Sequence, residues 1–193
     1  MTSRDLYRLV GISLAVIVLL VAGAAAETVT GLRPAEPQPT QVTPGLAVEY
    51  TYGRVNHIDE LKGRKYEPGP PLESINYRWS GNVLTSKVRE GVAANIDGFI
   101  RFEKAGVYGF EVTSNDGVRV EIGGKVLHVD PEIHSDTTSD RIDVKIDTPG
   151  WYPLKIVYFQ KKGTASLVLA WVGPGEKGKA VPVPAKAYGY VKK

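Results

Sequence analysis

The sequence predicts an all-β domain, an antiparallel β-sandwich or barrel, preceded by an N-terminal apolar helix and a proline-rich linker. Two observations support the all-β class. Short segments alternate apolar and polar residues with a period of two, which is typical of strands with one buried face. Gly, Pro, Asn and Asp separate these segments, and no stretch after residue 26 has helical periodicity. Together these features favour many short strands packed as two layers.

Residues 1–26 predict a signal peptide or a membrane anchor. Arg4 and Arg8 give a weakly basic start, and Leu9–Ala22 is apolar throughout. The small residues Ala24–Ala26 suit signal cleavage, whereas Leu9–Ala26, at 18 residues, is just inside the lower limit of about 17–25 residues for a helix that spans a bilayer. Both alternatives place the rest of the chain outside the cytoplasm, in the periplasm or cell envelope, secreted or anchored. Only this segment is expected to touch a membrane.

The second predicted unit is a linker over residues 27–44. Pro34, Pro37, Pro39 and Pro44 favour extended polyproline geometry. No alternating or helical pattern accompanies them, so we expect this segment to bury no face. It would either hold the domain away from a membrane or form the disordered start of a secreted domain.

The globular domain is predicted over residues 45–190, and its strands follow from the alternation. The expected elements are a strand at 46–52, a short helix or turn at 57–61, a loop at 62–71, strands at 75–79, 91–102, 108–113, 118–122 and 125–129, a polar loop at 130–140, strands at 141–146, 152–158 and 165–171, and an edge strand or extended tail at 181–184. Tyr188 and Tyr190 are expected to pack back on the sandwich.

The stretch from Tyr108 to Lys125 organises this domain. It contains two alternating strands separated by Ser-Asn-Asp-Gly at 114–117, which predicts a polar hairpin turn. Asn, Asp and Gly tolerate positive φ, so the turn needs no ligand to explain it. Its side chains are nevertheless the strongest candidates for binding chemistry in the chain.

Composition excludes several classes of function. The 193 residues carry a net charge of +3 with no Lys/Arg run, which argues against nucleic acid as a partner. The absence of cysteine excludes disulfides, thiolate metal sites and a cysteine nucleophile. The sequence has no Gly-x-Ser-x-Gly elbow, phosphate loop or His-Glu-x-x-His motif, and no carboxylate pair for glycoside hydrolysis can be identified. We therefore expect a protein without enzymatic activity.

The segment His128–Asp136 concentrates histidines and carboxylates. Such side chains bind Zn²⁺ or Ni²⁺, but their spacing matches no zinc motif and Pro131 prevents presentation from a helix. The favoured interpretation is a solvated polar loop. In the alternative interpretation the loop lies beside the Asn-Asp turn, and Asp130 and Asp136 complete a calcium site.

The order of these motifs resembles a lectin-like domain family, named after the fourteen-kilodalton fragment of a bacterial toxin's protective antigen. The resemblance covers residues 45–190 and implies a β-sandwich of the kind found in toxins, adhesins, glycosidases and bacterial envelope proteins. The matching segments are Gly98–Phe102, Gly106–Phe110, Thr113–Val120, Ile122–Lys125, Gly150–Leu154, Val157–Phe159 and Leu167–Trp171.

The resemblance also implies a site. Sugar-binding members carry two adjacent aspartates joined by a cis peptide, which hold a Ca²⁺ ion that grips sugar hydroxyls. The matching positions here are Asn115 and Asp116, so an amide replaces the first carboxylate. An amide oxygen ligates calcium without adding charge, and calcium affinity rises with the number of carboxylates. Weaker calcium binding, or none, is therefore expected.

The resulting predictions are a glycan or envelope component as partner and calcium as the one cofactor. The predicted ligand-binding residues are Asn115, Asp116, Gly117 and Trp151, and the predicted metal ligands are Asn115, Asp116, Asp130 and Asp136. Trp151 is included because aromatic rings stack on the apolar faces of sugars and this residue follows a turn. The alternative is a structural or protein-interaction module that binds no sugar.

Overall fold

The computed structural model describes residues 27–78 and 81–192. The predicted signal peptide or anchor, residues 1–26, lies outside the described residues, as does Trp79 at the end of a predicted strand. Within the described ranges, no helix is long and apolar enough to cross a membrane.

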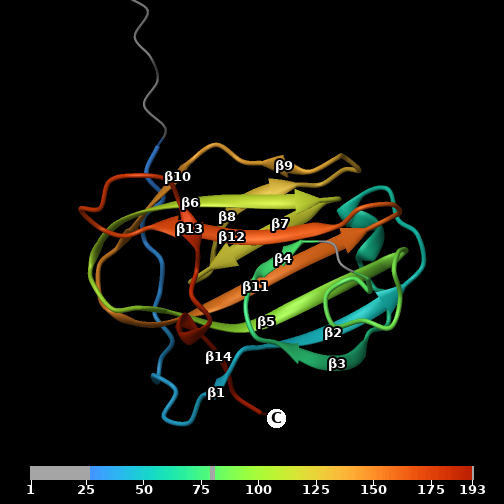
Figure 1. Cartoon of the computed structure of the whole chain (residues 1–193). Helices are drawn as coiled ribbons and strands as arrows, with labels where there is room; N and C mark the ends of the chain where they lie inside the picture. The colour runs from blue at the N-terminus through green and yellow to red at the C-terminus, as the bar shows by residue number, and fades with distance from the viewer. Residues whose placement is uncertain (1–26, 79–80, 193) are drawn as a thin grey trace, which may run out of the picture.

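The chain forms two antiparallel sheets that pack face to face, which confirms the all-β prediction (Figure 1). The larger sheet contains β1 (Thr43–Pro44), β2 (Leu46–Tyr52), β3 (Glu67–Leu72), β5 (Val92–Phe102), β7 (Val118–Ile122), β8 (Lys125–Asp130), β11 (Gly150–Gln160) and β14 (Tyr188–Tyr190). The smaller contains β4 (Asn76–Arg78), β6 (Gly106–Asn115), β9 (Thr137–Thr138), β10 (Ile142–Ile146), β12 (Ser166–Val172) and β13 (Val181–Pro182). Two short 3₁₀ turns, η1 (Ile58–Leu61) and η2 (Ala185–Ala187), complete the described elements.

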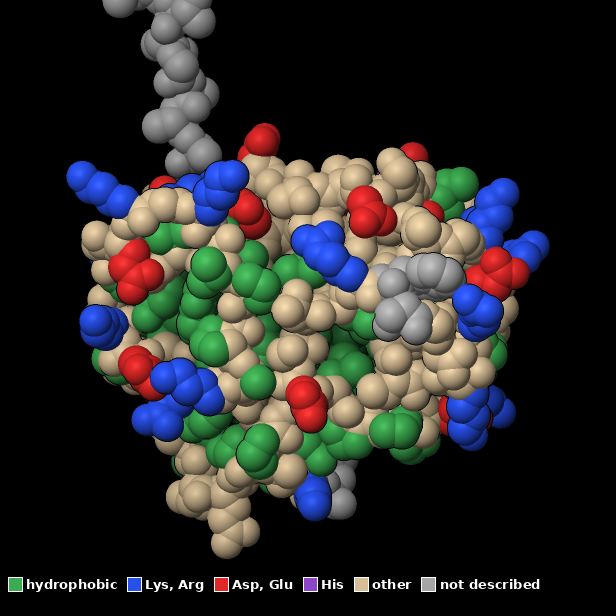
Figure 2. All heavy atoms as spheres, in the orientation of Figure 1, with side chains coloured by type: hydrophobic (Ala, Val, Ile, Leu, Met, Phe, Trp, Pro, Cys, Tyr) green, Lys and Arg blue, Asp and Glu red, His purple; other side chains and the backbone are tan. Residues whose placement is uncertain are grey.

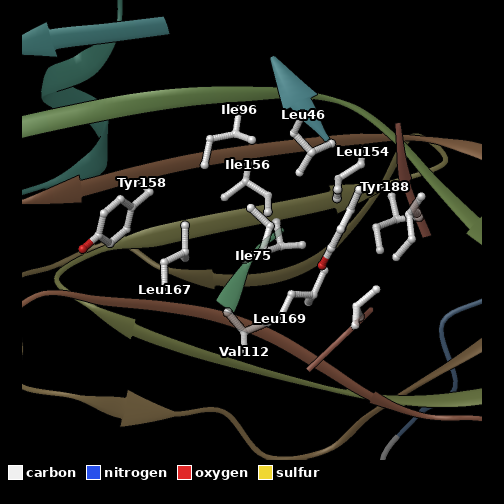
Figure 3. Packing of buried hydrophobic residues seen from close by; sticks show 14 of the residues in the cluster. Leu46, Ile75, Ile96, Val112, Leu154, Ile156, Tyr158, Leu167, Leu169 and Tyr188 are labelled. Carbon is white, nitrogen blue, oxygen red and sulfur yellow. The ribbon is translucent and has the colours of Figure 1, made fainter. Parts of the chain in front are cut away.

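The core lies between the sheets and follows from the period-two pattern. In the larger sheet, Ile96 of β5 pairs with Ile156 of β11. In the smaller sheet, Val112 of β6 pairs with Leu169 of β12. Figure 3 shows these side chains facing one another across the gap. Because each strand buries alternate residues, the central strands of both sheets contribute to one continuous apolar layer.

One end of the core is an aromatic cluster centred on Phe102, which is fully buried. Its ring makes edge contacts with Tyr108 and Tyr152, at centroid distances of 4.9 and 5.2 Å. Phe110 and Trp171 lie 6.2 and 5.8 Å away. The cluster therefore joins β5 and β11 of one sheet to β6 and β12 of the other.

The segment predicted to bury nothing is partly built into the domain. Leu32 and Ala35 are buried, and Val29 forms a parallel bridge with Val144 at the edge of the smaller sheet. The expectation that residues 27–44 bury no face is therefore wrong. Periodicity indicates only regular elements. It does not indicate an extended segment that packs through single apolar side chains.

The loop predicted at 62–71 also differs, since β3 occupies its second half. Pro68, Pro70 and Pro71 donate no ladder hydrogen bonds, which argued against a strand. The structure removes this conflict because, among the described strands, β3 pairs with β2 alone and is therefore an edge strand. Gly69 allows the close approach, since a Cβ there would lie 2.4 Å from the ring of Tyr50.

Candidate functional site

The Asn-Asp turn connects the two sheets instead of forming a hairpin. Asn115 is the last residue of β6 in the smaller sheet, and Val118 begins β7 in the larger one. Directly after Asn115, the Asp116 amide donates to the Phe159 carbonyl (3.1 Å), and the Phe159 amide donates to the Gly117 carbonyl (3.0 Å). The hairpin prediction is wrong because turn-forming residues mark where a strand ends, but not which sheet receives the next strand.

The backbone of this turn has the cis peptide that the resemblance implies, but it lacks the positive φ values expected of a hairpin turn. The Asn115–Asp116 peptide is cis, and none of Asn115, Asp116 and Gly117 has a positive φ. The Asn-Asp-Gly tripeptide is therefore not explained by a need for the left-handed backbone conformation. Gly117 is required by space instead, since a Cβ there would lie 2.4 Å from Cε1 of Phe159 and 3.1 Å from the Asp130 carbonyl oxygen.

Gly117→Ala is expected to lower the free energy of unfolding by about 1–3 kcal/mol, the usual cost of overpacking a filled core. The reason is that Phe159 is fully buried and cannot rotate away without disturbing its neighbours. Gly173→Ala is the matched control, because its added Cβ meets only the far end of the exposed Glu176 side chain. Urea denaturation of both variants checks the prediction, and equal losses would contradict it.

Asp116 is a buried carboxylate, 6% exposed, that ties two loops together. Its Oδ1 accepts a hydrogen bond from the backbone amide of His134 (3.1 Å), and its Oδ2 accepts one from the amide of Lys161 (2.7 Å). His134 lies between β8 and β9, and Lys161 follows β11. One side chain therefore fixes the position of both segments beside the turn.

Asn115 is equally buried and uses its amide as a donor. Its Nδ2 donates to Oδ1 of Asp136 (2.9 Å) and to Oγ1 of Thr164 (3.0 Å). Its carbonyl accepts from the Tyr158 hydroxyl at 2.5 Å. Burial, and then nearby groups that include Asp116 and Asp136, raise the pKa of Tyr158 well above its ordinary value, so the hydroxyl remains a donor.

A cavity of about 340 Å³ opens beside this pair of residues. Its lining combines polar side chains, two lysines and one exposed apolar residue, and consists of Asn115, Asp116, Ile133, His134, Ser135, Lys161, Lys162, Gly163 and Thr164. Ile133 is 46% exposed, so it offers an apolar surface at a polar site. Such a combination suits a ligand that has both hydroxyl groups and an apolar face.

The predicted metal ligands divide into two groups. Asp136 joins the turn through its hydrogen bond from Asn115, as the calcium alternative requires. Asp130 instead approaches His134, with Oδ2 3.2 Å from Nε2, and neither Asp130 nor Asp136 lines the cavity. Nearby, burial lowers the pKa of His128, with Asp130 opposing and His134 adding to this effect, so His128 is neutral at pH 7.

The oxygen atoms at the turn can be compared with the ligands that a calcium ion requires. Across residues 27–78 and 81–192, no group of three or more His, Cys, Asp or Glu side chains is placed to hold a metal. The hard donors at the turn are Asp116, Asp136, Thr164 and the amide of Asn115. As oriented, that amide presents nitrogen, and rotation about χ2 would present its oxygen to the same neighbours. With the amide turned in this way, the site offers two carboxylates and two neutral oxygens, fewer than the six to eight oxygens that calcium usually takes, so any calcium binding is expected to be weak.

Trp151, by contrast, lies far from the turn. It stands near the start of β11, whereas Tyr158 and Phe159 beside the turn stand near its end. Trp151 and Tyr158 are seven positions apart along the strand, or about 23 Å. The Arg101 guanidinium stacks over its ring at 5.7 Å. The structure therefore does not bring Trp151 to the cavity, and any role in ligand binding there has no geometric support.

Only part of this site is visible in the sequence. The sequence identifies Asn115, Asp116 and Asp136, but not Ile133, Lys161 or Thr164. The last two belong to the loop between β11 and β12, which carries no motif and is placed here by the pairing of Ser166 with Asn115 and by the hydrogen bonds to Asp116 and Asn115.

The fold and this buried turn define a two-sheet β-sandwich domain. The chain belongs to the PA14 domain family, which matches residues 72–184, more than half of its length. The resemblance read from the sequence is thereby confirmed. No relative was found among curated protein sequences.

Several solved structures are similar to this chain. The PA14 domain of the MpAFP antifreeze protein has a TM-score of 0.64 at 18% identity, with 79% of this chain and 93% of that chain covered. A PA14 sugar-binding domain from an RTX adhesin gives 0.62 at 18% identity, covering 77% and 99%. The A domain of epithelial adhesin 6 from Candida glabrata, in complex with Galβ1-3GlcNAc, gives 0.63 at 12% identity, covering 83% and 94%. At these identities the likeness establishes the fold.

Proposed function

We propose that this protein is a non-catalytic glycan-binding module whose ligand site is the cavity at the Asn115–Asp116 turn. The observation that carries the proposal is the cavity itself, which opens on a fixed amide and carboxylate and includes the exposed Ile133. Two similar structures, the RTX adhesin domain and epithelial adhesin 6, are described as sugar-binding or sugar-bound. The apolar segment at residues 9–22 supports placement outside the cytoplasm, where such glycans occur.

Pyranose sugars match this lining chemically. Their C–H face suits Ile133, and their hydroxyls can accept from Lys162 and donate to the Asp116 carboxylate. Lys161 already donates to Asn56 through Nζ (2.5 Å), so its position is fixed while Lys162 is exposed. The site needs no proton transfer for this task, which is consistent with a role in recognition.

Calcium is part of the proposal. Asp116, Asp136 and the amide oxygen of Asn115 would hold it, and the ion would supply positive charge for binding adjacent sugar hydroxyls. An alternative function is a structural or protein-interaction module without a metal. One observation favours it, because the donation from Asn115 to Asp136 satisfies these side chains without a cation.

Thermal unfolding of the full chain in EDTA and in 10 mM calcium tests the ion. With Kd near 1 mM, calcium should stabilise the native state by about 1.4 kcal/mol, which raises Tm by about 3–5 °C. Asn115→Asp adds a carboxylate opposite Asp136, so it should lower Tm in EDTA and enlarge the calcium gain. Asp140→Asn, at an exposed position, is the control and should match the unaltered protein.

Binding itself is tested by probing a glycan array with the full chain in calcium, followed by titration of the best ligand. We expect saturable binding that Ile133→Asp weakens at least fivefold. If the protein binds glycan but calcium does not raise Tm, only the calcium part of the proposal is rejected. No glycan binding in either buffer would reject the proposal and support the structural module.

A further inference from the structure

A second pocket lies at the opposite end of the sandwich. Its cavity, about 230 Å³, is bounded by the β5–β6 turn, the β12–β13 loop and η2. Strand β6 links the two sites, since Tyr108 lines this pocket and Asn115 ends the same strand. The two residues are seven positions apart along the strand, or about 23 Å. Figure 2 shows hydrophobic side chains gathered at this left-hand end, with Lys or Arg and Asp or Glu side chains around them.

The floor of the pocket is the partly exposed ring of Trp171, which packs against three other aromatic rings. Tyr108 and Phe110 lie at centroid distances of 5.3 and 6.0 Å, and Phe102 at 5.8 Å. Because the indole packs against three other rings, its exposed part can contact a ligand with little loss of side-chain freedom on binding. A fixed, partly exposed aromatic ring suits the apolar face of a sugar ring.

The walls of the pocket are also fixed before any ligand arrives. A Cβ at Gly106 would lie 2.6 Å from Cβ of Pro174, so the β5–β6 turn and the β12–β13 loop are in contact. The Tyr108 hydroxyl donates to the Lys104 carbonyl at 3.1 Å. Glu176 accepts from the Gly173 amide at 3.3 Å, which closes the second loop. The pocket is therefore preorganised.

The rim carries an excess of positive charge. Arg101, Lys104 and Lys186 line the pocket together with Glu103 and Glu176. Glu176 is engaged with its own loop. Among the ion pairs formed by described residues, none includes Lys104 or Lys186, and both are exposed. Two ammonium groups that form no ion pair among the described residues, beside an aromatic ring, favour a ligand that carries a carboxylate.

We propose that this second pocket binds an acidic saccharide, a hexuronic acid residue that stacks on Trp171 while its carboxylate pairs with Lys104 and Lys186. Glu103, one of the two glutamates at the rim, is then placed to accept hydrogen bonds from sugar hydroxyls. This site is independent of the cavity at the Asn115–Asp116 turn and does not depend on the function proposed for it.

The test is calorimetric titration of the full chain with trigalacturonic acid and with its fully methyl-esterified counterpart, which keeps the rings and removes the charge. We expect the acid to bind, the ester to bind at least fivefold more weakly, and binding of the acid to weaken between 50 and 500 mM NaCl, as screening requires. The Lys104→Ala/Lys186→Ala variant should lose at least fivefold in affinity, whereas Lys155→Ala/Lys192→Ala, with both residues exposed elsewhere, should lose less than twofold.

Trp171→Phe tests whether the ligand stacks on the indole, because this substitution keeps an aromatic ring in the cluster. In ¹⁵N spectra, the acid should shift the Trp171 indole signal and leave the Thr164 amide unchanged, which separates this pocket from the turn. No binding at 10 mM, equal binding of acid and ester, or shifts confined to the turn would each overturn the proposal.

Discussion

Asp116→Ala is expected to lower the free energy of unfolding by about 2–4 kcal/mol and to abolish ligand binding at the turn. The substitution leaves the amides of His134 and Lys161 without an acceptor, and each unsatisfied, partly buried N–H costs about 1–3 kcal/mol. The two loops that form the cavity should then separate, because this carboxylate binds both of them. Urea denaturation measures the first effect.

Hydrogen exchange distinguishes this positioning role from a general loss of stability. The amides of His134 and Lys161 should lose protection in Asp116→Ala by a larger factor than core amides such as that of Ile156. Asp140→Ala is the control, since Asp140 is exposed and belongs to the same polar loop as His134. A loss below 1 kcal/mol, or uniform changes in exchange, would contradict the role assigned to Asp116.

Phe102→Ala is expected to cost about 3–5 kcal/mol, the usual range for removing a large aromatic side chain from a core. Phe102 is fully buried and contacts rings from β6, β11 and β12. Its removal leaves a cavity that four rigid neighbours cannot fill. Because those neighbours support Trp171, affinity at the second pocket should fall as well.

Phe99→Ala is the matched control on the same strand. Phe99 is only partly buried and lies on the opposite face of β5, so the loss should be clearly smaller. Denaturation of the two variants compares the faces of one strand directly. Equal losses would mean that the aromatic cluster contributes no more than an outer-face contact.

Period-two alternation determined most of the strands. It placed the boundaries of β2 at Leu46 and Tyr52 as observed, and it identified the inward residues of β11 and β12. The reason is that a strand with one buried face records its orientation locally, in every second residue. The motif order was equally informative, since it indicated the family whose PA14 domain matches residues 72–184.

What the alternation could not decide was which strands become neighbours. The same Asn-Asp-Gly segment would have suited a hairpin, yet β6 and β7 pair with different partners in different sheets. Likewise, Val29 and Leu32 carry no periodic signal, and the folded sheets alone give them places to dock, Val29 beside Val144 of β10 and Leu32 beside Gly123 at the β7–β8 turn. Pairing depends on contacts between distant segments, which local patterns do not record.

The sequence by itself thus determined the fold family and named Asn115, Asp116 and Asp136 as a candidate site. The tertiary structure alone decided that Lys161 and Thr164 join them, that Trp151 lies about 23 Å away, and that Trp171 forms the floor of a second pocket. The physical reason is that residue chemistry is local, whereas a binding site is made by the few side chains that folding brings within hydrogen-bond or packing distance.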